Sequence, residues 1–276
     1  MTELVYAILL IPIAILIEGV RRKFIARMHN RDGPPILQPF YDIVKLFGKE
    51  RYSHGNLIFE LVPYLAVICS VFMLLVVPFS IFGFEFDFLL LGYIFILQDT
   101  FYIFGALASR SPFAMYASVR ELLLMFGYEI TFIIVLTLFF YGTGATSFQN
   151  YNTEFAFMQL PLVSLFLMFT AFIILRVTPY DVMTAEAEIG AGFFSEYSAK
   201  PLAILEIAEF IKDFVVYMLL GFLIVGKTYA LILAPVFMIF YVIMLTSSPR
   251  YSTIVTAKTF LILALLAFAD IVFLVI

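Results

Sequence analysis

The stretch LVPYLAVICSVFMLLVVPFSIFGF, residues 61–84, decides the fold class, because its 24 residues include no charged side chain. A helix needs about 20 apolar residues to cross the hydrocarbon core of a bilayer. Three further runs are uncharged and also exceed 20 residues, at 130–153, 155–175 and 228–249. We therefore expect each of these four runs to form a transmembrane helix.

The composition of the whole chain points the same way. Its 276 residues are 64% hydrophobic and 13% charged, and the mean hydropathy is +1.08. A soluble domain carries roughly 25% charged residues. The predicted fold class is therefore an all-α integral membrane protein.

Four weaker spans complete the prediction, at 4–20, 88–109, 214–226 and 257–276. The uncharged part of 214–226 is too short to cross a bilayer, so this helix must extend back through Asp213, Lys212 and Glu209. We expect about eight transmembrane helices in a single polytopic membrane domain, residues 1–276. One of them takes carboxylates into or beside the membrane.

The distribution of basic residues predicts the orientation. If residue 1 lies outside, the cytoplasmic segments are about 21–56, 108–120, 176–212 and 248–258, and they hold 15 of the 16 Lys and Arg residues, all except Lys227. Cytoplasmic loops of membrane proteins are enriched in Lys and Arg. Both termini are then external. The positive charges follow the first apolar stretch, whereas a signal peptide has them in front, so we expect this stretch to be retained as helix one.

The sequence predicts no cofactor, metal or catalytic residue in this chain. Cys69 is the only cysteine, and an iron–sulfur cluster needs several thiolates. His29 and His54 are the only histidines; both lie in one basic loop without metal-ligand spacing, and we interpret them as solvated. There is no glycine-rich phosphate loop and no nucleophile motif. Nothing indicates nucleic-acid binding.

The first predicted cytoplasmic loop, 21–56, is strongly basic. After Pro39, the apolar residues Phe40, Ile43, Val44 and Phe47 recur at helical spacing, which predicts a short amphipathic helix. Two interpretations stay open and both could hold: an interfacial helix attracted to anionic lipid, or a platform for a cytoplasmic partner. The candidate docking residues are Arg22, Lys23, Arg27, Arg31, Gln38, Asp42, Lys45 and Lys49.

The segment 176–213 concentrates negative charge. Carboxylates at the bilayer centre cost about 2.5–3.5 kcal/mol on insertion scales, so they are usually paired, hydrated or functional. A solvated cytoplasmic loop is the plainer interpretation for the acids between 181 and 196, but it explains Glu209 and Asp213 poorly. A row of close carboxylates also titrates as a group, as a proton pathway requires. The candidate pathway residues here are Asp181, Glu186, Glu188, Glu196, Glu206, Glu209 and Asp213; the last three lie at i, i+3 and i+7 on one helical face.

A second acidic set, Asp99, Glu121 and Glu129, lies on the predicted third and fourth spans. Arg110 or Arg120 could neutralise Glu121 in a structural ion pair. Glu129 has no basic neighbour in sequence and is the stronger candidate for carrying a proton.

Residues 178–199, TPYDVMTAEAEIGAGFFSEYSA, resemble the loop between helices five and six of the NuoH-like subunit of respiratory complex I. The matching positions are Asp181, Glu186, Glu188, Gly192, Glu196, Tyr197 and Ser198. The first loop and GYE at 127–129 are also similar, and the resemblance covers essentially the whole chain. In two departures, Thr184 and Arg21 each replace a family glutamate. The compact GPPILQP at 33–39 is more similar to the homologous subunit of membrane-bound [NiFe]-hydrogenases and related sulfur reductases.

The resemblance implies a membrane anchor and coupling subunit in the cytoplasmic membrane of a prokaryote, linking redox chemistry in partner subunits to H⁺ or Na⁺ translocation. The implied partners are peripheral Fe–S and NiFe-like large subunits, which would hold the Fe–S clusters and any NiFe centre, and antiporter-like membrane subunits. The alternative is the quinone-chamber subunit of a complex I-type dehydrogenase acting on NADH, ferredoxin or F420. An autonomous secondary transporter is disfavoured, because no repeat of halves is evident.

Overall fold

The computed structural model describes residues 2–50, 55–77, 84–151, 156–176, 180, 192–226, 229–247, 258 and 262. All regular structure in these ranges is helical. The elements in chain order are α1 (Thr2–Met28), α2 (Gln38–Phe47), α3 (Leu57–Val76), α4 (Asp87–Ala108), α5 (Pro112–Thr143), α6 (Ala156–Gln159), α7 (Pro161–Ile174), the 3₁₀ helix η1 (Phe194–Glu196), α9 (Ala199–Ile224) and α10 (Ala230–Ser247). The predicted all-α class is therefore confirmed for the described residues.

Three of these helices, α3, α4 and α5, are long and apolar enough to cross a membrane. Two shorter apolar helices, Pro161–Ile174 and Ala230–Met244, follow. These helices agree with a membrane protein. The predicted last span, 257–276, lies almost wholly outside the described residues, and the count of eight stays a prediction.

Local signals set helix boundaries that the apolar runs do not. The uncharged run 61–84 begins at residue 61, but α3 already begins at Leu57. The helix starts earlier because the Asn56 side chain caps it, accepting a hydrogen bond from the Ile58 N–H at 3.1 Å. α5 ends at Thr143, ten residues before its uncharged run does, because Gly144 adopts a left-handed conformation with φ of 69°. The chain beyond folds back onto α9, where the Tyr151 hydroxyl donates to the Leu223 carbonyl at 2.6 Å.

Three predicted cytoplasmic segments are partly helical. α1 continues to Met28 and ends where Asn30 takes a left-handed φ of 56°, so residues 21–28 extend the first helix. In the same way α5 starts at Pro112 and α9 starts at Ala199. Part of the charge of these segments thus lies on helices rather than on loops, as for Arg21, Arg120 and Lys212.

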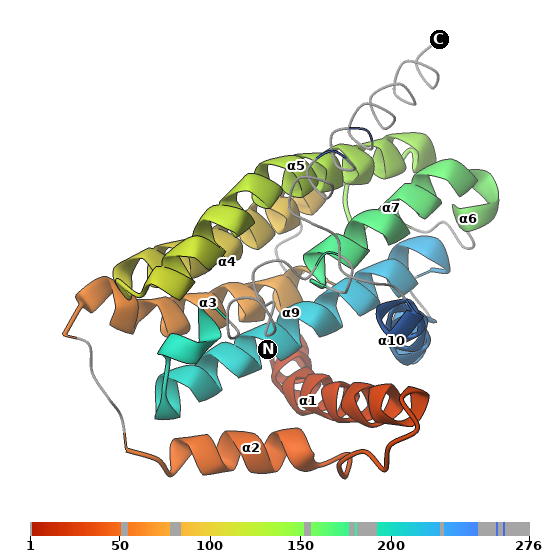
Figure 1. The fold of residues 1–276 in the computed structure, drawn as a ribbon. Helices are drawn as coiled ribbons and strands as arrows, with labels where there is room; N and C mark the ends of the chain where they lie inside the picture. Colours follow the sequence, from red (N-terminus) through yellow and green to blue (C-terminus); the bar gives the residue numbers. More distant parts are fainter. Residues whose placement is uncertain are drawn as a thin grey trace.

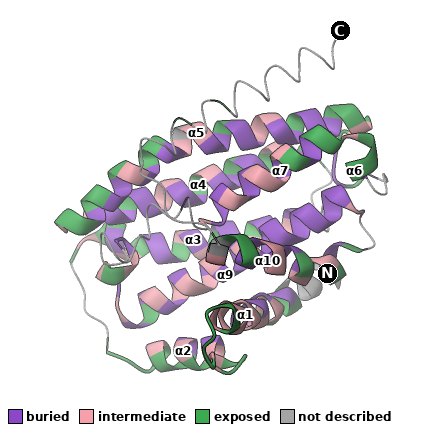
Figure 2. Ribbon diagram, turned by 45° about the vertical axis from the view of Figure 1, so that its right-hand side comes forward, coloured by how far each residue is buried: buried purple, intermediate pink, exposed green. Residues whose placement is uncertain are grey.

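Helix α9 is the centre of the molecule. It contacts α3 and α10 most extensively, and it also packs on α1, α2 and α7. Figure 1 shows α9 running between α3 on one side and α1 with α2 on the other. Figure 2 shows that its C-terminal half is almost entirely buried, and this half includes Phe214, Tyr217 and Phe222. The predicted backward extension of the short sixth span is confirmed as one uninterrupted helix, which includes Glu209, Lys212 and Asp213.

The predicted amphipathic helix is present as α2. Pro39 occupies its first turn, where a missing N–H costs nothing. Ile43 is buried against α1 and α9, whereas Tyr41, Val44 and Phe47 are exposed. The apolar residues therefore divide between an inner face and an outer face.

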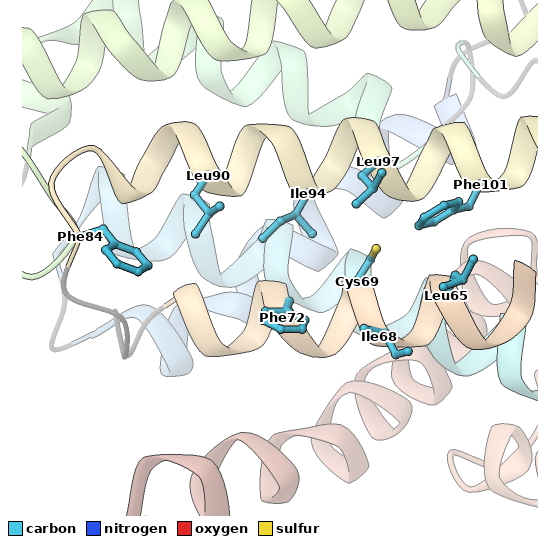
Figure 3. A pocket seen from close by; sticks show the side chains of 9 residues that line it. All are labelled: Leu65, Ile68, Cys69, Phe72, Phe84, Leu90, Ile94, Leu97 and Phe101. Carbon is cyan, nitrogen blue, oxygen red and sulfur yellow. The ribbon is translucent and has the colours of Figure 1, made fainter.

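An apolar groove lies between α3 and α4 (Figure 3). Its cavity of about 440 Å³ is lined by apolar residues and the thiol of Cys69: Leu65, Ile68, Cys69, Phe72, Phe84, Leu90, Ile94, Leu97 and Phe101. No charged side chain lines it. The groove is thus chemically distinct from the charged interior described next.

Candidate functional site

Arg176 is the centre of a buried ion cluster. It follows α7 directly, in a left-handed conformation with φ of 48°, and its side chain is only 8% exposed. Its guanidinium reaches three carboxylates from three helices: Asp99 Oδ1 on α4 at 2.9 Å, Glu121 Oε1 on α5 at 3.1 Å and Glu209 Oε1 on α9 at 2.9 Å. Burial lowers the pKa of Arg176, but Glu121, Asp99 and Glu209 outweigh this effect and raise it well above its ordinary value.

Lys212 and Tyr128 complete this group, which we call the Arg176 cluster (Asp99, Glu121, Tyr128, Arg176, Glu209 and Lys212). The Lys212 ammonium is fully buried and lies 2.6 Å from Asp99 Oδ1. The Tyr128 hydroxyl lies between two carboxylates, 2.9 Å from Asp99 Oδ2 and 3.1 Å from Glu121 Oε1. With one hydrogen, it can donate to only one of them at a time.

The charges of the Arg176 cluster do not balance. Among the described residues, three carboxylates face two basic side chains, so one negative charge is in excess when all five groups are ionised. Burial of an uncompensated charge is expensive. A mobile proton or small cation would compensate it, and this is the chemical capacity of the site.

Glu129 lies next to Tyr128 in the chain and is also buried on α5, at 4% exposure. Its Oε1 atom has no hydrogen-bond partner among the described residues. A lone buried carboxylate is stabilised when it takes up a proton or meets a cation. Its geometry is that of an acceptor beside the cluster rather than of a structural ion pair.

The expected partners of Glu121 were wrong. The structure pairs Glu121 with Arg176, 55 residues further along the chain, whereas the guanidinium of Arg120 lies over the Tyr116 ring at 4.4 Å. Adjacent residues on a helix do not face each other. This is why Arg120 could not neutralise Glu121.

A second charged group lies where α1, α2 and α9 meet. Glu18 on α1 pairs with Arg21 and, at 3.0 Å, with Arg22. Arg22 Nη1 lies 3.0 Å from Asp42 Oδ2 on α2, and Arg21 Nη2 lies 3.9 Å from Asp213 Oδ2 on α9. These contacts join α1, α2 and α9.

The three acids of α9 that share a helical face have different surroundings. Glu209 belongs to the Arg176 cluster and Asp213 faces Arg21. Glu206 is partly buried, and its Oε2 atom has no hydrogen-bond partner among the described residues. Burial raises the pKa of Glu206; Arg22 opposes this effect, and Asp42 and Glu18 add to it. Helix α9 thus carries acids to both charged groups.

The remaining predicted pathway acids lie elsewhere. Glu196 is on η1, partly exposed, and no described ion pair links it to the Arg176 cluster. Asp181, Glu186 and Glu188 lie outside the described residues.

Some of the predicted docking residues bind one another, and others are exposed and available to a partner. Gln38 Nε2 donates to Asp42 Oδ1 at 2.8 Å, and Arg22 also holds Asp42, so these three bind each other. Arg27, Arg31, Lys45 and Lys49 are exposed, while Lys23 is intermediate.

Sequence reasoning missed the cations and the tyrosine that organise the site. Arg176 was counted only as a cytoplasmic positive charge. Lys212 was placed in the extended sixth helix but was not paired with an acid, and Tyr128 was not proposed as a site residue. The available signal was Lys212, a lysine within the length that the sixth helix needs, which implied a buried acidic partner. No group of His, Cys, Asp and Glu in the described part of the chain could hold a metal ion.

The helical fold and this buried cluster define a class: an integral membrane protein with ionisable side chains gathered in its interior. The chain belongs to the NADH dehydrogenase family, whose model matches residues 2–276. The family resemblance of the loops is thereby confirmed.

Two relatives and one solved structure are informative. Formate hydrogenlyase subunit 4 of Escherichia coli (strain K12) is 29% identical over 226 residues, 77% of this chain and 73% of the relative. NADH-ubiquinone oxidoreductase chain 1 of Papio hamadryas is 30% identical over 265 residues, 89% of this chain and 78% of the relative. A chain in the structure of the membrane-bound sulfane sulfur reductase, an archaeal respiratory membrane complex, superimposes with a TM-score of 0.81 and 22% identity, covering 97% of this chain and 98% of that chain. This structural similarity to the sulfane sulfur reductase chain shows that the two chains share a fold.

Proposed function

We propose that this chain is the membrane anchor and coupling subunit of a complex I-like redox complex of the hydrogenase or sulfur-reductase type. Electron transfer in peripheral subunits would be linked to movement of H⁺ or Na⁺ through the Arg176 cluster. The observation that carries the proposal is the imbalance of three carboxylates, the buried Asp99 and Glu121 and the partly buried Glu209, against the two basic side chains of the cluster. A purely structural cluster would gain by being neutral.

The order of acids supports a route through the interior. Glu129 lies beside the cluster on α5, Asp99 and Glu121 lie within it, and Glu209 connects it to α9. Asp213, one turn further along α9, faces the second charged group at Arg21. A cation moving along this row would meet carboxylates from α5 to α1.

The proposed setting is the cytoplasmic membrane of a prokaryote, with about eight spans in one polytopic domain and both termini external. Peripheral Fe–S and NiFe-like subunits would hold the redox centres, and antiporter-like subunits would lie alongside in the membrane. The exposed basic residues Arg27, Arg31, Lys45 and Lys49 are the proposed contacts for the peripheral module. We also propose that ions enter the route past four further acids, Asp181, Glu186, Glu188 and Glu196.

A quinone-chamber subunit is the second candidate. The observation in its favour is the 30% identity, over 89% of this chain, to NADH-ubiquinone oxidoreductase chain 1. Quinone retained by the purified complex, together with inhibition by quinone-site ligands, would favour this candidate over the first.

The test uses the intact complex, purified from its host through a tag on this chain and reconstituted in liposomes. Mass spectrometry identifies the subunits, while vesicle acidification and ²²Na⁺ uptake are recorded together with electron transfer. Asp99→Asn should abolish ion uptake, whereas the control Glu85→Gln, at an exposed carboxylate before α4, should behave as the parent does. Unchanged uptake per electron in Asp99→Asn would refute a route through the Arg176 cluster.

A further inference from the structure

The segment 193–197 is docked firmly on α3 and α4. Phe193 is fully buried and Tyr197 is 4% exposed. The Tyr197 ring stacks on Phe59 with centroids 4.0 Å apart and planes at 4°, and its hydroxyl donates to the Phe59 carbonyl oxygen at 2.9 Å. Stacking and the hydrogen bond together fix the position of this segment.

Gly105 on α4 makes this docking possible. A Cβ at this position would lie 2.7 Å from Cε2 of Phe193 and 2.8 Å from the Tyr197 hydroxyl oxygen. Small residues allow close approach between packed segments within membranes. The aromatic pair is therefore seated directly against the backbone of α4.

Tyr102 lies one turn before Gly105 and contacts both this segment and the ion cluster. Its ring centroid lies 5.4 Å from that of Phe193. The Arg176 guanidinium lies over the same ring, with Cζ 5.3 Å from the centroid. Such a contact between a cation and an aromatic ring is attractive, and more so when buried.

The orientation of Tyr102 is held by a chain of hydrogen bonds. Gln98 Nε2 donates to its hydroxyl oxygen at 2.7 Å, and the Ser70 hydroxyl lies 3.2 Å from Gln98 Oε1 and 2.9 Å from the Ala208 carbonyl. Side chains from α3 and α4 and the backbone of α9 thus define one position for the ring.

We propose that Tyr102 is a positioning residue that couples the docked segment 193–197 to the Arg176 cluster. Arg176 lies before, and Phe193 lies after, the first three acids of the segment 176–213 that the sequence singled out. Both meet on the same ring. Phe193 is fully buried, whereas Ser195 in the same segment is exposed. A peripheral subunit that shifted the segment 193–197 would move Phe193, the Tyr102 ring and the guanidinium, changing which carboxylates Arg176 neutralises. This inference rests on the proposed function and names how that function is controlled.

The test measures ions moved per electron in the reconstituted complex. Tyr102→Leu removes the ring, Phe193→Leu removes the contact from the segment, and Tyr102→Phe keeps the ring without its hydroxyl. Tyr102→Leu should lower ions moved per electron by about fivefold, the scale set by losing a buried cation–aromatic contact. Phe193→Leu removes only the ring contact to Tyr102 and should lower the same ratio by a smaller factor. Electron transfer should stay at the parental rate. Tyr102→Phe keeps the ring over Arg176 but loses the hydrogen bond from Gln98, so its coupling should lie between those of Tyr102→Leu and the parent. A merely structural role would reduce both activities together.

Asp99→Asn in the same vesicles distinguishes a failure of the proposed function from a failure of the proposed role of Tyr102. If Asp99→Asn moves ions as the parent does, the proposed function fails. If Asp99→Asn is inactive while both leucine variants are parental, only the role of Tyr102 is overturned. Where Tyr102→Leu fails to assemble, Phe193→Leu decides, because it leaves Tyr102 and every charged residue in place.

Discussion

The Lys212 ammonium lies 2.6 Å from Asp99 Oδ1, although 113 residues separate the two in the chain and neither side chain is more than 1% exposed. The contact fastens α9 to α4 inside the apolar core. Arg176 binds the same oxygen at 2.9 Å, so one carboxylate serves two cations.

Removal of Lys212 should therefore destabilise the fold. Lys212→Met is expected to cost about 3–5 kcal/mol, because breaking a buried ion pair leaves an under-compensated charge. The double variant Lys212→Met/Asp99→Asn should cost less than the sum of the single changes. Unfolding in detergent measures both, with the exposed Lys45→Met as control. Additive losses would contradict the pairing.

Glu209→Gln should uncouple ion movement from electron transfer and leave assembly intact. Glutamine can still accept the hydrogen bond that Arg176 Nη1 donates at 2.9 Å, but it cannot exchange a proton. Ions moved per electron are compared with Glu85→Gln, which neutralises an exposed carboxylate. Equal pumping by the Glu209 variant and the parent would remove Glu209 from the route.

Glu206→Gln should change the pH dependence of stability. The pKa of Glu206 is raised by burial, so above about pH 4.3 the unfolded carboxyl ionises while the folded one retains its proton. Stability of the parent then falls as pH rises towards the folded pKa. The variant should match the parent in acid and become the more stable of the two as pH rises. Melting curves across this range test it, and a difference independent of pH would refute the burial effect.

Gly19→Ala should loosen α2 from α1. A Cβ on Gly19 would clash with the Ile36 carbonyl oxygen, which forces the chain leading into α2 to move. Overpacking of this kind costs about 1–3 kcal/mol. Gly48→Ala is the matched control, since its nearest neighbour would be 3.6 Å away. Similar melting temperatures for the two variants would argue against the close approach.

Charge reversal at Arg27 and Arg31 should weaken attachment of the peripheral module. Both side chains are exposed on the basic end of α1 and the turn after it. Opposite charges steer and hold partners at interfaces, and the effect should weaken with salt. Co-purification of peripheral subunits is compared with Arg110→Glu, an exposed arginine on another turn. Unchanged recovery would leave this surface as a lipid contact.

Much of the fold could be predicted from the sequence, because the membrane interior places strict requirements on the backbone. Long uncharged runs can satisfy their backbone groups within a membrane only as helices or closed barrels, and the runs at 61–84 and 130–153 indeed contain most of α3 and the second half of α5. Their ends depended on Asn56 and Gly144, whose caps are weaker local signals. The sequence also identified Asp99, Glu121, Glu129 and Glu209 as charges too costly to be incidental.

Only the tertiary structure decided which charges meet. Arg176, Glu121, Asp99 and Glu209 come from four places in the chain, and no spacing rule joins them. Side-chain partners within a helix obey a fixed periodicity, whereas partners between helices depend on how those helices pack. The sequence by itself therefore determined that this protein must bury ionisable groups, and the packing of α4, α5 and α9 around Arg176 determined the site that they form.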